Sequence, residues 1–237
     1  MLHPPEQSEL AFYITVPSAC NYLPDRKAVT VFADPFAGMT KALYSTLVEL
    51  GFRRSGDHVY VPYCSNCDAC VPARLPVARF RVSRSQRRTW QRNSDVTVQR
   101  VAAAFHDEHY RLYQRYVAQR HPGGGMEHYG PEQYLAFFGC SWGETWLYEF
   151  RCGGDLLAVA SVDHLRSGLS AVYTFFDPAQ SERGLGIYAV LWQISEAARL
   201  NLPFVYLGYW IAESDKMNYK ANFQPLEIYR DGHWADL

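Results

Sequence analysis

The chain has 237 residues, of which 48% are hydrophobic and 20% charged, and its formal net charge is −1 at pH 7. This balance is that of an ordinary globular protein with one large or two small domains, and a net charge near zero predicts no partner by itself. No apolar run approaches the roughly 20 residues that span a bilayer, and the N-terminus lacks a basic segment followed by an apolar one, so we expect a cytoplasmic protein with no membrane partner.

The first hundred residues predict short strands and two helices. The strands are rich in β-branched and aromatic residues and are expected at residues 11–16, 28–35, 58–63 and 73–80. Residues 39–52 have apolar side chains at helical spacing and end at Gly51, and residues 83–95 predict a helix that is capped by Ser83.

The remaining residues show a different order of elements. Helices are expected at residues 106–121 and 130–139. Three strands joined by tight glycine turns, the pattern of an antiparallel meander, follow at residues 145–152, 155–166 and 169–178. A loop and helix, a buried strand, a short helix and two closing segments complete the chain at residues 181–200, 203–211, 214–223, 225–230 and 233–237.

This order of elements predicts an α+β fold with a mixed sheet and helices. The change in character near residues 100–130 divides the chain into two expected parts. An N-terminal α/β module, residues 1–105, contains most of the cysteines and a basic helix, and a C-terminal domain, residues 106–237, contains the meander.

Three cysteines stand at three-residue spacing in the N-terminal module: Cys64, Cys67 and Cys70. Thiols of a cytoplasmic protein stay reduced, so this spacing indicates metal or redox chemistry more than disulfides. A zinc site or an iron–sulfur cluster usually takes four ligands, and Cys20 is the best fourth candidate, because Cys140 and Cys152 have the pattern of small buried hydrophobic residues. Ligand type does not separate zinc from an iron–sulfur cluster, and inert reduced thiols are the alternative.

The most basic stretch of the chain follows directly. Eight arginines and one acidic residue, Asp95, fall within residues 71–100. On a helix, four of the arginines share one face: Arg84, Arg87, Arg88 and Arg92. Guanidinium groups pair bidentately with phosphate, which indicates a nucleic-acid backbone or an anionic substrate, and a solvated helix face is the equal alternative.

An RGLG segment, with Arg183, Gly184 and Gly186, lies between the last strand of the meander and the next helix. Backbone N–H groups at a helix N-terminus bind anions. The segment is neither a Walker A motif nor a complete GxGxxG. A strand, a glycine loop, a helix and a strand in this order are the layout of an acetyltransferase-type acyl-CoA site.

Several segments together resemble a known family. They are CNYLPDR (20–26), YCSNCDACVPARLPV (63–77), SRSQRR followed by RN (83–93), LSAVYTFFDP (169–178), RGLG (183–186) and LPFVYLGYWI followed by KMNYKANFQPLE (202–227). These segments are similar to those of the bacterial aspartate/glutamate leucyltransferases, which are relatives of the eukaryotic arginyl-tRNA–protein transferases. The similarity spans almost the whole chain, and the segments occur in the family's order.

The resemblance implies an acetyltransferase-like (GNAT) C-terminal domain and an aminoacyltransferase. Such an enzyme conjugates leucine from leucyl-tRNA to proteins with N-terminal Asp or Glu, as a degradation signal of the N-degron pathway. The resemblance also places Cys20, Cys64, Cys67 and Cys70 where relatives are associated with a metal or cluster, while the transfer itself requires no cofactor. An arginyl-tRNA donor, a CoA-dependent N-acetyltransferase and a zinc-containing RNA-binding module are the alternatives.

Aminoacyl transfer requires an ester and an amine to be positioned, a proton to be accepted and an oxyanion to be stabilised. We expect this site where strand 169–178 splays from strand 203–211. The candidates for binding and proton transfer there are Tyr173, Asp177, Tyr209 and Lys216, although Asp177 before a proline also suits a simple turn. The candidate cations for the acceptor's carboxylate are Arg84, Arg87, Lys216 and Lys220.

The arginine face and the RGLG amides are expected to hold tRNA phosphates. In this hypothesis, the thiol site fixes the loop that leads into the arginine helix, and a redox-sensing role of the thiols is the competing explanation.

Overall fold

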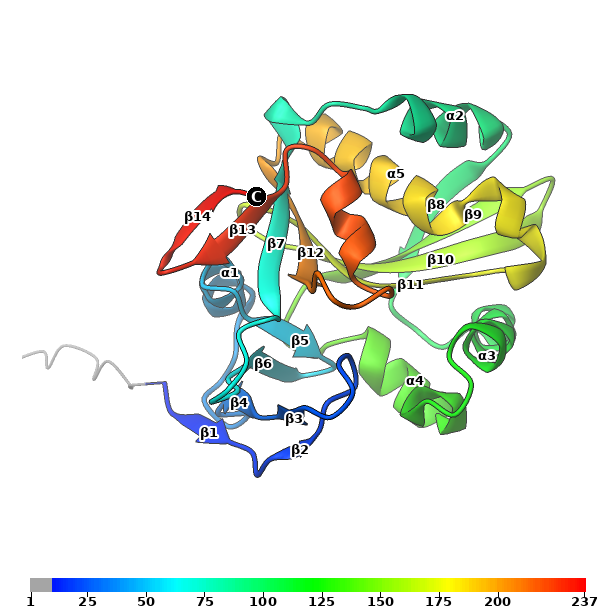
Figure 1. The fold of residues 1–237 in the computed structure, drawn as a ribbon. Helices are drawn as coiled ribbons and strands as arrows, with labels where there is room; N and C mark the ends of the chain where they lie inside the picture. The colour runs from blue at the N-terminus through cyan, green and yellow to red at the C-terminus, as the bar shows by residue number, and fades with distance from the viewer. Residues whose placement is uncertain (1–9) are drawn as a thin grey trace, which may run out of the picture.

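The computed structural model describes residues 10–237, which form an α+β fold around an eight-stranded mixed sheet (Figure 1). The strand order across this sheet is β14-β13-β7-β12-β11-β10-β9-β8. In chain order the strands are β7 (Val71–Pro76), β8 (Thr97–Ala102), β9 (Thr145–Cys152), β10 (Asp155–His164), β11 (Gly168–Phe176), β12 (Phe204–Trp210), β13 (Glu227–Arg230) and β14 (His233–Asp236). The predicted fold class is confirmed.

The predicted meander forms the centre of the large sheet. Strands β9, β10 and β11 pair antiparallel in succession. Gly153 and Gly154 make the first turn at φ values of 56° and 99°, which glycine adopts readily because it has no Cβ atom. A helix, α5 (Leu185–Arg199), then carries the chain over one face of the sheet, so that β12 returns parallel to β11.

Helices cover the large sheet on both faces (Figure 1). Helix α5 packs with Leu185, Ala189 and Ile194 on one face, where it also supports α2 (Arg84–Arg92). Helices α3 (Asp107–Arg120) and α4 (Pro131–Phe138) cover part of the opposite face through an aromatic cluster that contains Tyr113 and Phe175. The apolar faces predicted for these helices are therefore buried, which stabilises the sheet between them.

A second, smaller layer covers the rest of that opposite face. Its sheet has the order β1-β4-β6-β5 and is accompanied by a short two-stranded pair. The elements are β1 (Phe12–Ile14), β2 (Ser18–Ala19), β3 (Lys27–Ala28), β4 (Thr30–Ala33), α1 (Lys41–Glu49), β5 (Arg53–Ser55) and β6 (His58–Pro62). Leu47 and Val48 of α1 pack with Val59, Leu165 and Tyr206, so this layer shares a core with the large sheet.

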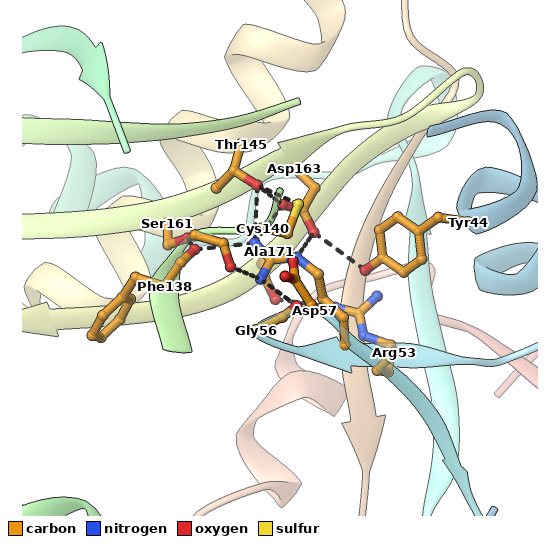
Figure 2. Close-up of polar contacts among 12 residues, drawn as sticks. Tyr44, Arg53, Gly56, Asp57, Phe138, Cys140, Thr145, Ser161, Asp163 and Ala171 are labelled. Atoms are coloured by element: carbon orange, nitrogen blue, oxygen red, sulfur yellow. Dashed lines mark hydrogen bonds and ion pairs between the residues drawn. The ribbon is translucent and has the colours of Figure 1, made fainter. Parts of the chain in front are cut away.

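A buried ion pair also joins the two layers (Figure 2). Arg54 of β5 binds Asp163 of β10 with two bonds, Nε to Oδ2 at 2.8 Å and Nη2 to Oδ1 at 2.6 Å. The remaining Arg54 N–H groups donate to the carbonyl oxygens of Gly56, Phe138 and Gly139. Tyr44 and Thr145 donate their hydroxyls to Asp163. Every charged atom of this pair is thus compensated, as a buried pair requires.

The large sheet takes strands from both sides of the predicted boundary at residue 105. β7 lies between β13 and β12, and β8 forms the edge beside β9. The division into two domains stays a prediction, but the sheet is not confined to residues 106–237. Local patterns do not reveal this, because strand pairing over such distances depends on tertiary contacts.

The structure corrects one predicted element and adds strands that were not expected, among them β5 and β8. Residues 214–223 are not a helix from a Ser/Asp cap but turns followed by a 3-10 helix, η4 (Asn218–Asn222), from which the Lys220 side chain points into the protein. Strands β5 and β8 were not expected, since their arginine and glutamine residues conceal the strand pattern. Among the described residues, no helix is both long and apolar enough to cross a membrane.

Candidate active site

Strands β11 and β12 pair over a short stretch and then separate, which is the splay that the sequence predicted. The register joins three residue pairs: Gly168–Phe204, Leu169–Val205 and Ser170–Tyr206. Both strands continue beyond these pairs, β11 to Phe176 and β12 to Trp210. Backbone groups past the last pair have no partner in the other strand.

A β-bulge marks each strand where the separation begins. The pairing of β11 with β10 shifts at Val172, and the pairing of β12 with β7 shifts at Leu207. Gly208 follows with φ of 78°, a conformation that side chains rarely adopt. Bulges redirect strands and are frequent beside active sites. The local sequence of both strands therefore produces the splay.

Tyr173 lies on β11 just past the splay, surrounded by the rings of Tyr116, Phe137 and Phe138. Its hydroxyl is buried and has no hydrogen-bond partner among the described residues. Burial raises the pKa of Tyr173, so the group stays a protonated donor. A buried donor without an acceptor is costly, so this hydroxyl is an unsatisfied donor enclosed beside the splay.

The other three candidates for binding and proton transfer have different environments. Asp177 accepts from Ala179 N at 3.0 Å and begins the 3-10 helix η3 (Pro178–Arg183), so it has the turn position that its sequence also suited. Tyr209 is buried and donates to Gly51 O at 3.1 Å. Lys216 is exposed. The side chains of Asp177 and Tyr209 are already bonded to the backbone.

Lys220 is buried and donates its Nζ to the carbonyl oxygen of Tyr209, with Met217 Sδ at 3.7 Å. Burial, with a smaller contribution from the nearby Arg53, lowers the pKa of Lys220 to about 7, while Cys70 opposes the shift. The sequence predicted Lys220 as a candidate cation for the acceptor's carboxylate and as a substrate- or tRNA-binding residue, and the structure places it inside the protein.

The four predicted thiols are brought together on the face opposite α5. Cys20 lies between β2 and β3, and the other three lie between β6 and β7. Cys20, Cys67 and Cys70 pack near Leu23 and Tyr209. Burial raises the pKa of Cys70 to about 12, with additional contributions from all three other thiols. Cys140 and Cys152 lie elsewhere, beside Thr145 and Asp95 respectively.

The fit of this thiol cluster to a metal is incomplete. Four sulfur donors suit zinc or an iron–sulfur cluster chemically. Among the described residues, however, no group of three or more His, Cys, Asp or Glu side chains is arranged to hold a metal ion. Individual thiols instead accept backbone N–H groups, as Cys64 does from Val29 at 3.4 Å. A metal or cluster at these cysteines therefore stays a prediction.

The predicted basic helix is present as α2. Ser83 accepts from Gln86 N, and the Gln86 side chain returns to Ser83 N, so the expected cap is a complete capping box. The arginines predicted to share one face are all exposed: Arg84, Arg87, Arg88 and Arg92. Arg92 donates to the carbonyl oxygen of Glu182, and no ion pair engages the other three among the described residues.

The RGLG segment lies directly against α2. Asn93 Nδ2 donates to Arg183 O at 2.8 Å, and Gly184 adopts φ of 64°, with Thr89 beside it. Arg183 itself is bound bidentately to Asp95 at 2.8 and 2.9 Å. The structure thus joins the two predicted phosphate-binding features into one surface, but it pairs Arg183 with an acid rather than leaving it free.

The thiols and the arginine helix lie at opposite ends of β7 (Figure 1). The Cys64–Cys70 loop precedes this strand, and α2 follows it. Helix α2 rests on α5, where Trp90 and Tyr188 stack with ring centroids 5.3 Å apart. The predicted support of the basic helix by the thiol loop is therefore not a direct contact, because α5 supplies the packing.

Two family models match most of the chain. The model described as "Arginine-tRNA-protein transferase, N terminus" matches residues 18–88, and the one described as "Arginine-tRNA-protein transferase, C terminus" matches residues 108–230. The chain belongs to this transferase family. The first model contains the thiol cluster and the start of α2, and the second contains both strands of the splay.

Relatives of this transferase cover its whole length. Proteins named "Aspartate/glutamate leucyltransferase" are 56% identical in Nitrosococcus oceani, over 95% of both chains, and 50% identical in Pseudomonas entomophila, over 98% of this chain and 99% of the relative. The structure of L-PGS from Bacillus licheniformis is 12% identical with a TM-score of 0.48 and covers 72% of this chain and 49% of that one.

One residue at the splay of this transferase was not predicted. Arg53 of β5 donates from Nη2 to the carbonyl oxygens of Ala171 at 3.0 Å and Tyr206 at 3.4 Å, where the two strands part. The signal in the sequence was an Arg-Arg pair that begins two residues after the Gly51 helix stop. Consecutive strand residues face opposite sides, and both arginines of this strand are buried.

Proposed function

We propose that the chain transfers leucine from leucyl-tRNA to the N-terminal amine of proteins that begin with Asp or Glu. The observation that carries this proposal is the 56% identity over 95% of both chains to a protein named aspartate/glutamate leucyltransferase. The product bears an N-terminal leucine, which we propose acts as a degradation signal of the N-degron pathway.

The transfer is an ester aminolysis. The neutral α-amine of the acceptor attacks the carbonyl carbon of the leucyl ester, and a tetrahedral oxyanion forms. The C–O bond to the tRNA ribose then breaks, the amide bond remains, and one amine proton leaves with the ribose oxygen or with a base. Because the α-amine has an ordinary pKa near roughly 8, it needs only mild base assistance, and positioning dominates the rate.

The splay suits this chemistry in two ways. Past Ser170 and Tyr206 the two strands no longer pair with each other, and we propose that the aminoacyl group enters between them beside Arg53. The Tyr173 hydroxyl is a buried, unpartnered donor on one of these strands, and we propose that it donates to the oxyanion. Asp177 and Tyr209 are left out of the reacting groups, because each has a backbone partner.

The tRNA is proposed to bind along α2 and the RGLG segment. Arg84, Arg87 and Arg88 are exposed and without an acidic partner among the described residues, and the α5 N-terminus begins beside them. Guanidinium groups and helix N-termini both bind phosphate. Affinity for leucyl-tRNA is therefore expected to fall steeply with salt.

The test offers purified protein separately with labelled leucyl-tRNA or labelled arginyl-tRNA and a peptide that begins with Asp. Label is expected in the peptide with the leucyl donor, and a peptide with an acetylated N-terminus is the control. Absence of labelled peptide with both donors would refute the proposal.

An arginyl donor is the second candidate, since the matching family models are described by arginine-tRNA. Labelled peptide from arginyl-tRNA alone would favour it. Product from acetyl-CoA in the same assay would instead indicate the acetyltransferase alternative.

A further inference from the structure

Arg53 carries a buried charge without a counter-ion. The residue is 7% exposed, and no carboxylate of the described residues lies within ion-pair distance of it. Arg54, the next residue, is bonded bidentately to Asp163. Figure 2 shows Arg53 beside this pair, on the side of Ala171. A buried cation without a partner costs several kcal/mol, which adjacent Arg54 avoids and Arg53 does not.

The guanidinium of Arg53 has unused donors. Only Nη2 is bonded, to the carbonyl oxygens of Ala171 and Tyr206. Nε and Nη1 have no hydrogen-bond partner within the described residues. Neither nitrogen is fully enclosed, so both reach solvent-accessible space. Their fork geometry matches a carboxylate.

The guanidinium of Arg53 lies directly against a glycine, Gly208. A Cβ at Gly208 would lie 3.6 Å from Arg53 Nε, in contact with the guanidinium. Burial raises the pKa of Tyr60, and the positive charge of Arg53 lowers it, so the two side chains are close enough to interact. Lys220 lies nearby, and its charged form opposes the rise in the pKa of Cys70.

We propose that Arg53 binds the side-chain carboxylate of the N-terminal Asp or Glu of the acceptor protein. This proposal rests on the proposed function. In Asp one methylene, and in Glu two, join the carboxyl group to the carbon that bears the reacting amine, so the selecting cation must lie close to the reaction. Arg53 lies where β11 and β12 separate, whereas the exposed arginines of α2 lie beyond α5.

The same geometry explains rejection of Asn and Gln. Their side-chain amides match the carboxylates in shape but are neutral, and their NH₂ groups would face the Arg53 N–H groups. The carboxylate gains a charge-assisted bond that the amide lacks. Selection by one such bond corresponds to about a 10- to 100-fold preference.

The experiment compares Arg53→Gln with the wild type on two peptides that differ only in their first residue, Asp or Asn. We expect the ratio of kcat/KM for Asp over Asn to fall about 10- to 100-fold in Arg53→Gln, with the Asn peptide unaffected, and Arg53→Lys to retain part of the preference. A purely structural role would lower both peptides together and leave the ratio unchanged, which would overturn the proposal.

Arg74→Gln is the matched control. Arg74 lies in β7 of the same sheet, but it is paired with Glu227 at 2.6 Å and stacks on Phe204. Its loss is expected to leave the ratio of Asp to Asn unchanged. If the wild-type protein modifies neither peptide, the proposed function itself is refuted. If the wild type prefers the Asp peptide and Arg53→Gln keeps the same preference, only the role proposed for Arg53 is refuted.

A second measurement covers the case in which Arg53→Gln does not fold. In wild-type protein with isotope-labelled arginine, the Nε–Hε resonance of Arg53, assigned with Arg53→Lys, is followed by NMR as each peptide is added. We expect the Asp peptide to shift it and the Asn peptide to leave it in place. Equal shifts, or none with either peptide at saturation, would overturn the proposal.

Discussion

The arginines of β5 and those of α2 show two ways in which the fold treats the same side chain. On α2, Arg84, Arg87 and Arg88 point to solvent without acidic partners. On β5, Arg54 is enclosed and meets Asp163 and three carbonyl groups. Water solvates the first set at little cost, whereas the second must be compensated by the protein.

Arg53 belongs to neither group. It is enclosed like Arg54 but unpaired like the arginines of α2. Where burial and lack of a counter-ion coincide, a bound anion is the missing compensation. The role of an arginine therefore depends on its burial and its ion pairing together, and not on its charge alone.

The largest expected effect breaks the compensated pair. Asp163→Ala leaves the Arg54 guanidinium buried without its carboxylate, so we expect a loss of about 3–5 kcal/mol in the free energy of unfolding. Urea denaturation measures this loss, with Arg84→Ala as an exposed control that changes stability by less than about 0.5 kcal/mol. Equal stabilities of the two variants would contradict the view that the buried Arg54 needs its carboxylate while the arginines of α2 are solvated by water.

A second prediction extends the comparison to another compensated carboxylate, Glu149. Burial alone would raise its pKa, but hydrogen bonds from Arg151, Gln99 and His109 lower it to about 2 from 4.5. Because the folded pKa is below the unfolded one, this stability is complete above pH 4.5 and is lost as pH falls toward about 2.

Glu149→Gln tests this pH window. We expect the variant to lose up to about 3 kcal/mol at neutral pH and to show a flatter loss of stability between pH 4.5 and about 2. Thermal unfolding across that range measures both. A wild-type curve parallel to that of the variant would show that Glu149 does not supply the acid sensitivity.

The third prediction concerns the solvated arginines. Arg84→Gln, Arg87→Gln and Arg88→Gln combined should leave the unfolding free energy nearly unchanged but weaken leucyl-tRNA binding by about 10-fold or more, with a smaller salt dependence. Filter binding at several salt concentrations measures both quantities. An unchanged salt slope would assign α2 to solubility rather than to tRNA.

The smallest expected effect concerns the space beside Arg53. Gly208→Ala forces a side chain into φ of 78° and places Cβ against the guanidinium, so we expect about 1 kcal/mol of destabilisation. It should also reduce transfer to the Asp peptide several-fold more than to the Asn peptide. Equal reductions for the two peptides would indicate strain without obstruction of the carboxylate site.

Several elements of the fold were readable from local patterns. The meander was predicted because β-branched and aromatic runs alternate with glycine turns, and α2 because Ser83 suits a helix N-cap, which the structure completes as a capping box with Gln86. The turn residues around Cys20 predicted a loop that can approach the Cys64–Cys70 loop, and the site that these thiols would form stays a prediction.

Other features depended on contacts between distant residues. Residues 214–223 have helical spacing, yet η4 forms there, with Lys220 turned inward to the carbonyl oxygen of Tyr209. Tyr209 has the residue type of a proton donor, but its hydroxyl is occupied by Gly51. A local sequence pattern does not predict which distant carbonyl group will accept a hydrogen bond from a given side chain.

The sequence by itself determined the family, the meander, the basic helix and the approximate place of the splay, because periodicity, capping and turn residues act over a few positions. Only the tertiary structure decided that β7 enters the large sheet, that Arg183 is paired, and that Arg53 is enclosed without a counter-ion. The physical reason is that burial and charge compensation depend on which distant layers pack together. The same Arg-Arg pair has little desolvation cost in water but a large one between two sheets.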